Sequence, residues 1–357
     1  MADTALATAI SHEIALIKYS RTLGKDASKY IDNIMKALKE ELLATDKVTT
    51  KKQKDELIRF INELFNSELG DWNGELEKDI TRLIKEEAKF HQASLSSLVG
   101  DKVARPTLES ITKAAYSTEM VLSGQAYTVD ERIKQYDVNS VDKVKRIVTG
   151  GWRDGLTTYE MMQQINGKQA SSVGNQMRKG ANILAKDLTS HISSTAKTKV
   201  GMDNSDIVIG EKAVATLDSK TSEKCARIAS EDNGGREYIY AEVGYNFERP
   251  PHHWGGCRTT HRYLLAPEYE ALEEPRTRPA VVDGKAKRVD SNESLYELAK
   301  KNPNMARELV GVERAKVLNA MSADEFTKIA YNRLDQLITI DELVKKSKVA
   351  AKALGRD

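Results

Sequence analysis

The chain has 357 residues, 40% of them apolar, and this length is typical of two or three structural units with buried cores. Its 55 basic and 53 acidic side chains nearly cancel, which argues against a protein that binds polyanions over its whole surface but allows local basic patches. With too few cysteines for a disulfide scaffold, no secretory signal and no run of about twenty apolar residues, we expect a soluble protein made in the cytosol.

The first third of the chain is predicted to form a bundle of separate helices. Apolar residues recur at helical spacing in three segments, 28–44, 51–69 and 73–99. Gly70 is expected to end the second helix. Short loops between such segments are typical of antiparallel packing, so we expect an N-terminal helical domain over residues 1–125.

Two histidines in the helical stretches are predicted to be structural. His91 lies near the apolar face of the third helix, and no second metal ligand is recognisable in the same turn. His191 falls in a later, long helical pattern and is expected to lie in a core or an interface.

Between these two histidines, Thr157 and Glu160 have the spacing of a capping box, which predicts a helix start.

After Gly201 the pattern changes from helical to extended. Short β-like runs cover residues 206–210, 213–217 and 237–240. A helix is expected to open at Ser222 and to place Cys225 in its first turns, where the helix N-terminus favours the thiolate. The sequence therefore predicts a mainly α protein with a small α+β module over residues 205–266.

This module holds both cysteines and three of the six histidines, His252, His253 and His261. Thiolate and imidazole are the ligands that zinc prefers, and a structural zinc site uses four of them. The candidate ligands of a structural site are Cys225, Cys257, His252, His253 and Asp218. The pattern does not choose between the two adjacent histidines, nor decide whether Asp218 is a ligand or a helix cap. Two unrelated buried thiols and a disulfide are the alternatives.

The same residue types could also serve catalysis. A cysteine near histidine and aspartate can be a nucleophile, and the His252–His253 pair beside Asp218 could hold the metal of a nuclease. However, no glycine-rich phosphate loop, HExxH helix or DxD-type cluster accompanies them. We therefore expect no catalytic residues, with a metal-dependent nuclease or an injected effector enzyme as the alternative.

Residues 267–290 are predicted to be a linker, because they contain three prolines and several basic residues. The basic side chains that could contact DNA phosphates are Arg276, Arg278, Lys285, Lys287 and Arg288, and a merely solvated linker is the alternative. Residues 291–357 return to a helical pattern. Thr339 and Glu342 are expected to cap the start of the final helix.

Two blocks around the cysteines resemble a known family. The first reads TLDSKTSEKC and the second PPHHWGGCR. Together they resemble the paired signature of the phage Mu F-like minor head proteins of tailed bacteriophages. Matching positions are Thr216, Leu217, Asp218, Thr221, Ser222, Cys225, Pro250, Pro251, His253, Cys257 and Arg258. Lys220 stands where the family has arginine, and His253 is one residue further from Cys257 than usual.

The resemblance covers roughly residues 138–345, and it implies a Mu F-like domain over 126–266. It implies a minor head, or head-morphogenesis, protein that is recruited to the portal vertex during procapsid assembly. Such a protein would stay inside the virion and affect DNA packaging or ejection. The implied partner is the portal protein, with major capsid protein, scaffolding protein and double-stranded DNA as further candidates. Structural zinc is the one candidate cofactor, and folding would need no membrane.

Overall fold

The structure is a computed structural model, and it describes residues 3–44, 46–100, 103–215, 217–219, 221–228, 230–231, 235–255, 257, 259–272, 277–290, 292–333 and 336–356. The chain divides into two compact units. Unit 1 comprises Met1–Ala15, Ile84–Ala126 and Ser190–Asp357, and unit 2 comprises Leu16–Leu83 and Tyr127–Thr189. The candidate site lies in unit 1.

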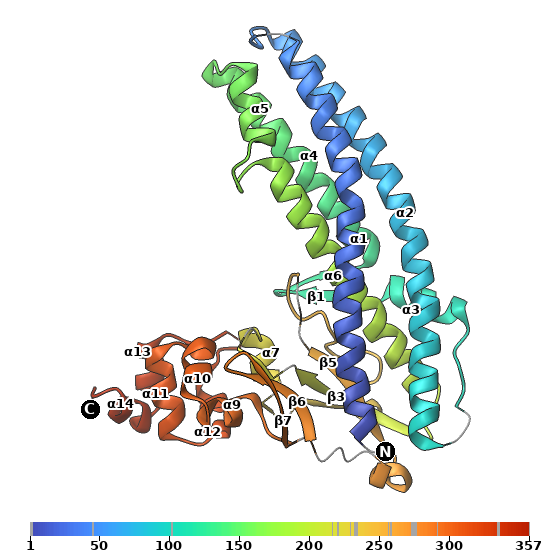
Figure 1. The fold of residues 1–357 in the computed structure, drawn as a ribbon, viewed down its shortest axis with the longest axis vertical. Coiled ribbons are helices and arrows are strands. Elements are labelled where there is room, and N and C mark those ends of the chain that lie inside the picture. The colour runs from blue at the N-terminus through green and yellow to red at the C-terminus, as the bar shows by residue number, and fades with distance from the viewer. Residues whose placement is uncertain are drawn as a thin grey trace. The chain divides into compact units, whose positions relative to one another are not determined.

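The chain is mainly helical, with three small antiparallel sheets among its described residues (Figure 1). The α-helices are α1 (Asp3–Leu43), α2 (Lys51–Val99), α3 (Leu108–Ser117), α4 (Val129–Asp154), α5 (Thr158–Asn166), α6 (Val173–Met202), α7 (Glu223–Ile228), α8 (Tyr240–Val243), α9 (Leu295–Lys300), α10 (Pro303–Val310), α11 (Val312–Ala320), α12 (Ala323–Ala330), α13 (Ile340–Lys346) and α14 (Lys348–Ala353). The strands are β1 (Met120–Leu122), β2 (Gln125–Tyr127), β3 (Val208–Ala215), β4 (Glu237–Ile239), β5 (Thr259–Leu265), β6 (Thr277–Val282) and β7 (Lys285–Asp290), and a 3-10 helix, η1, covers Pro267–Leu272.

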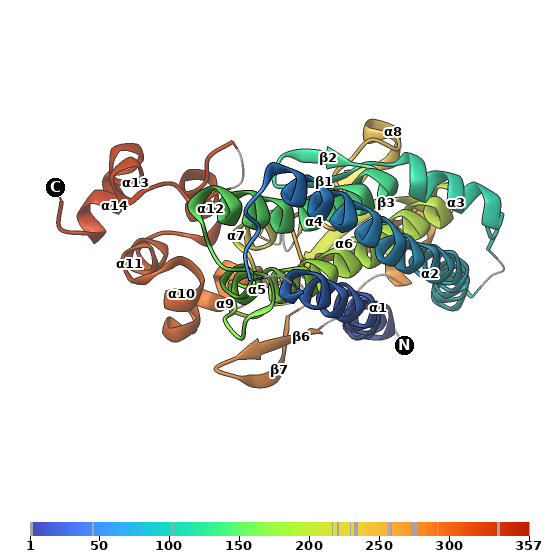
Figure 2. The ribbon, with the colours of Figure 1, turned by 90° about the horizontal axis from the view of Figure 1, so that it is seen from above.

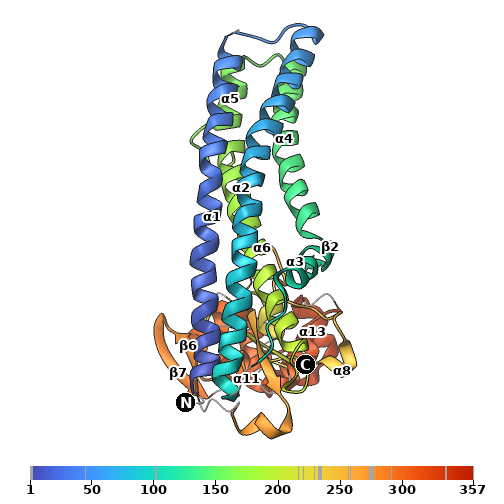
Figure 3. The ribbon, with the colours of Figure 1, turned by 90° about the vertical axis from the view of Figure 1, so that its right-hand side faces the viewer.

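Unit 2 is a bundle made from parts of α1, α2 and α6 together with α4 and α5 (Figure 3). Its core contains an edge-to-face pair of Trp72 and Tyr136, whose ring centroids are 5.3 Å apart. A buried ion pair joins α4 to α6, with Arg132 Nη2 3.0 Å from Asp187 Oδ2. Ring packing and a fully paired buried charge together favour one specific arrangement of these helices.

The helix break expected at Gly70 is wrong, whereas the break expected between residues 44 and 51 is confirmed. Helix α1 begins at Asp3, well before residue 28, and α2 continues through Gly70 to Val99. Apolar residues stay buried on both sides of this glycine, among them Leu69 and Trp72. A helical glycine costs about 1 kcal/mol relative to alanine, less than the burial of one large apolar side chain contributes. The periodic stripe therefore overrides the glycine.

Replacing Gly70 with alanine is expected to stabilise the protein by about 0.5–1 kcal/mol, because the backbone of the unfolded chain loses freedom. The glycine is exposed, and a Cβ at this position would meet no atom within 4 Å. The matched control is Gly151→Ala in α4, where a Cβ would lie 2.7 Å from the Met161 side chain. Thermal unfolding should rank Gly70→Ala above the wild type and Gly151→Ala below it. The reverse order would contradict the described helix packing.

Unit 1 contains a three-stranded antiparallel sheet in the order β4-β3-β5. The sheet pairs Ala215, at the end of β3, with Thr259, at the start of β5. Consequently, the segment that follows β3 and the loop that precedes β5 meet at the same edge of the sheet. These are the two segments that carry the cysteines.

The expected linker over 267–290 is wrong for most of its length. Strands β6 and β7 form a regular hairpin, and Ala280 and Val282 are buried in a cluster with the C-terminal helices. Figure 2 shows this hairpin beside α9. Three prolines obscured the strand pattern, but Pro279 lies on a two-stranded ribbon, whose open edges tolerate a residue without an N–H group.

Both expected capping boxes are confirmed. The Thr157 side chain accepts from the Glu160 N–H at the start of α5, and Thr339 caps α13 with Glu342 in the same way. Helix α13 is not the final one, because α14 follows it directly. The C-terminal helices share one apolar cluster with Leu217 and Ala226, so they cover the segments around α7.

Candidate metal centre

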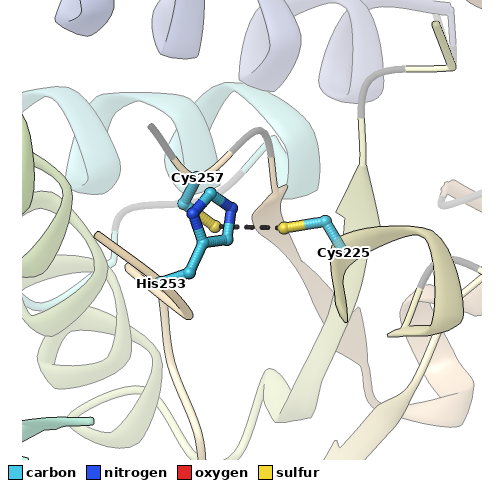
Figure 4. A group of neighbouring side chains, drawn as sticks. All are labelled: Cys225, His253 and Cys257. Atoms are coloured by element: carbon cyan, nitrogen blue, oxygen red, sulfur yellow. Dashed lines mark hydrogen bonds between the residues drawn. The ribbon is translucent and has the colours of Figure 1, made fainter. Parts of the chain in front are cut away.

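The structure brings Cys225, His253 and Cys257 together in unit 1 (Figure 4). Cys225 lies on α7, and the other two residues lie on the loop that leads into β5. One ligand atom from each residue lies within 4.8 Å of the others. These residues are far apart in the sequence. They meet because the end of β3 pairs with the start of β5.

The two thiols are free and in contact, with their Sγ atoms 3.5 Å apart. Both cysteines are buried, while His253 is half-buried. Two thiolates on one tetrahedral zinc ion, each about 2.3 Å from the metal, lie about 3.8 Å apart. The observed separation is compatible with two ligands of one ion, and it shows that the two buried thiols are neighbours joined by a hydrogen bond.

The electrostatics of the pair favour one thiolate. The hydrogen bond with Cys257 and a further one with His253 hold the pKa of Cys225 well below its usual value, against the opposing effect of burial. Burial raises the pKa of the Cys257 thiol, and the nearby Cys225 raises it further. One proton is therefore shared within the pair, and a bound divalent cation would displace it.

The loop that carries His253 is held by contacts on both sides. The Pro250–Pro251 peptide bond is cis, and the Pro250 carbonyl accepts a hydrogen bond of 2.7 Å from Ser194 Oγ on α6. The Arg249 guanidinium packs over the rings of Tyr245 and Phe247. The proline pair before His252 is thus anchored to a long helix.

Two of the candidate ligands lie outside the cluster. His252 is fully buried, but it faces Glu248, with 3.7 Å between its Nδ1 and Glu248 Oε1. Asp218 accepts a hydrogen bond of 3.2 Å from Thr221 Oγ1 and also accepts the Thr221 N–H at its own carbonyl. Within the described part of the chain, Asp218 is thus a turn residue, and His253 is the histidine that joins the two cysteines.

Two further motif residues, Leu217 and Ser222, make contacts that stabilise the local structure. Leu217 is buried and bridges to Ala280 of β6, and Ser222 Oγ accepts the backbone N–H of Cys225. Thr216 and Arg258 lie outside the described residues. Of the basic residues proposed to contact DNA, Lys285, Lys287 and Arg288 are exposed on the hairpin. Arg276 lies outside the described residues, and the side chain of Arg278 is not described.

Sequence reasoning missed a buried network of charged groups in the same unit. Glu211 of β3 accepts hydrogen bonds from Tyr240 Oη at 2.8 Å and from His261 Nδ1 at 2.9 Å. Lys197 of α6 is also buried, and its Nζ donates to the His261 carbonyl. A glutamate inside the apolar run of β3 was the available signal, because a buried carboxylate needs partners.

Comparisons with protein-family models, with curated proteins and with solved structures find no match to this chain. Among the helices the structure describes, none combines the length and the apolar character needed to span a membrane.

Proposed function

We propose that this chain is a minor head protein of a tailed phage, which binds the portal vertex during procapsid assembly and influences DNA packaging or ejection. The supporting observation is the meeting of Cys225 with His253 and Cys257, because these residues come from both blocks that resemble the phage family. In this proposal, both blocks supply ligands to the same metal ion. The protein would remain inside the phage head near the portal.

Among the described residues, the cluster supplies three of the four ligands that a structural zinc ion uses. Two sulfurs and one imidazole nitrogen are zinc ligands, and both sulfurs are shielded from solvent. Zinc bound here would join α7 to the loop before β5, where the sheet has only three strands. A small module with a limited core gains most from such a cross-link.

Binding surfaces for the partners are proposed on exposed elements of the same chain. The hairpin carries Lys285, Lys287 and Arg288 on its exposed positions, which suits an acidic partner surface or DNA phosphates. The N-terminal helices are the other proposed contact for the portal, major capsid or scaffolding protein. Neither surface requires a catalytic group.

Portal binding can be tested with assembled particles. The chain is co-expressed with the scaffolding and major capsid proteins of its phage, either with or without the portal protein. We expect it to copurify with portal-containing particles and to be lost from portal-free ones. Cys257→Ala should also reduce incorporation, while the exposed variant Glu86→Gln should not. Equal incorporation with and without the portal would contradict the proposal.

The number of ligands favours the enzyme alternative. The described cluster has three protein ligands, which is typical of a catalytic zinc ion with a fourth position open to substrate or water. Plasmid DNA incubated with the purified chain and magnesium or zinc tests it, with a chelator as the control. We expect intact plasmid. Metal-dependent nicking that disappears in His253→Ala would make the chain a nuclease.

A further inference from the structure

A second group of metal-ligating side chains lies in unit 1 and shares no residue with the cysteine cluster. It consists of His12 on α1 with Glu87 and His91 on α2, and one ligand atom from each lies within 4.8 Å of the others. His12 Nε2 is 2.8 Å from Glu87 Oε2, and His91 Nε2 is 3.4 Å from the same oxygen. Both imidazole nitrogens therefore lie close to one carboxylate oxygen of Glu87, between the two helices.

The backbone and the neighbouring side chains hold this arrangement in place. Glu87 and His91 are four residues apart, so both project from one face of α2. Ser193 of α6 donates its hydroxyl to Glu87 Oε2, and its Oγ lies 3.4 Å from His91 Nε2. The His12 ring stacks on Phe90, with centroids 3.5 Å apart and planes 11° from parallel. The ligands are thus oriented before any ion binds.

The cluster is enclosed on one side and accessible on the other. Glu87 and His91 are each 2% exposed, whereas the side chain of His12 is 18% exposed. An ion can therefore reach the site past His12 and lose most of its water on binding. His91 was expected to be structural because no second ligand was recognisable in its own turn, and its partner His12 lies on a different helix.

We infer that His12, Glu87 and His91 bind a divalent transition-metal ion such as zinc, with Ser193 as the residue that orients Glu87 and His91. Two imidazoles and a carboxylate are a donor set that zinc and related ions accept. Ligands about 2.0–2.1 Å from a tetrahedral ion lie about 3.4 Å apart, which matches the distance from His91 to Glu87. A small movement of His12 would complete the geometry. The fourth position is left for water.

The competing interpretation is a hydrogen-bonded cluster whose histidines only satisfy the buried carboxylate of Glu87. The two interpretations differ in whether the folded chain takes up an ion at these residues. The experiment uses the full chain with Cys225→Ser and Cys257→Ser, so that the cysteine cluster cannot contribute. Zinc is titrated by calorimetry, and bound zinc is measured after gel filtration.

We expect one equivalent of zinc on this cysteine-free chain and none after a further Glu87→Gln or His12→Gln substitution. Ser193→Ala should weaken zinc binding by about 10–100-fold, as is usual when a residue that orients a ligand is lost. Glu86→Gln is the matched control, because Glu86 is its exposed neighbour on α2 and should keep full binding. His12 is half-buried, so its variant remains informative if Glu87→Gln fails to fold. No zinc uptake by the folded cysteine-free chain, or unchanged uptake in folded His12→Gln, would overturn the inference.

Discussion

The Cys257→Ala variant is expected to bind no zinc at the cysteine cluster and to lose about 4 kcal/mol of unfolding free energy when free zinc is about 1,000 times Kd. Without this thiol, Cys225 and His253 remain as two ligands, which is too few for a stable site. The loss reflects binding energy that only the folded chain gains. Urea unfolding in buffered zinc measures the difference from the wild type.

Chelation and a pair of histidine variants make this test specific. A chelator should lower wild-type stability and leave Cys257→Ala nearly unchanged. His253→Gln should behave like Cys257→Ala, whereas His252→Gln should keep the zinc-dependent increment, because the His252 ring lies beside Glu248 and outside the group of ligand atoms. If Cys257→Ala keeps the full increment, the cysteines are not the ligands.

Lys197→Met is expected to lower the free energy of unfolding by about 3–5 kcal/mol, because it removes a buried positive charge that acts on Glu211 and the donor to the His261 carbonyl. Lys197 is 7% exposed, and its charge acts on Glu211, Glu13 and Glu87. Methionine keeps most of the side-chain volume, so the substitution isolates the charge. The matched control is Lys199→Met on the same helix, which removes a lysine paired with Asp203 near the surface. The control should cost less than about 1 kcal/mol, and equal losses would contradict the role of Lys197.

The same network should make unit 1 sensitive to acid. Burial raises the pKa of Glu211, but the hydrogen bond and charge of His261, with smaller effects of Thr198 and Lys197, outweigh it, so the folded pKa lies below the usual value. A carboxylate with a lowered folded pKa stabilises the protein above its unfolded pKa, and this stability is lost as the pH falls through the folded pKa. Glu211→Gln should therefore be less stable near neutral pH but less dependent on pH between about 5 and 3. An unchanged acid profile would contradict this assignment.

Local signals in the sequence were reliable where one interaction decides the structure. The Thr157–Glu160 and Thr339–Glu342 pairs formed capping boxes, since the hydrogen bonds lie within one turn. The Gly70 break failed because burial along the whole helix outweighs one local preference. The linker prediction was wrong because it depended on the prolines and overlooked the turn at Asp283 and Gly284 that joins β6 to β7.

The candidate site was predictable in composition but not in geometry. The sequence indicated that Cys225 and Cys257 belong to one site, but the choice between His252 and His253 depends on how the loop leaves Pro251. The group of His12, Glu87 and His91 could not be found from the sequence. Its members come from two helices, and His12 lies 75 positions before Glu87. Such pairings depend on tertiary packing, which no short motif records.

The central claim is that the two sequence blocks meet to bind one metal ion, and a cobalt titration tests it most directly. The reduced full chain carries His12→Gln, so that the second site does not contribute, and the thiolate-to-cobalt charge-transfer absorption is followed. We expect this band to saturate at one cobalt per chain while both thiols become protected from thiol reagents. A folded, reduced chain that shows no such band and keeps both thiols reactive with cobalt present would contradict the claim.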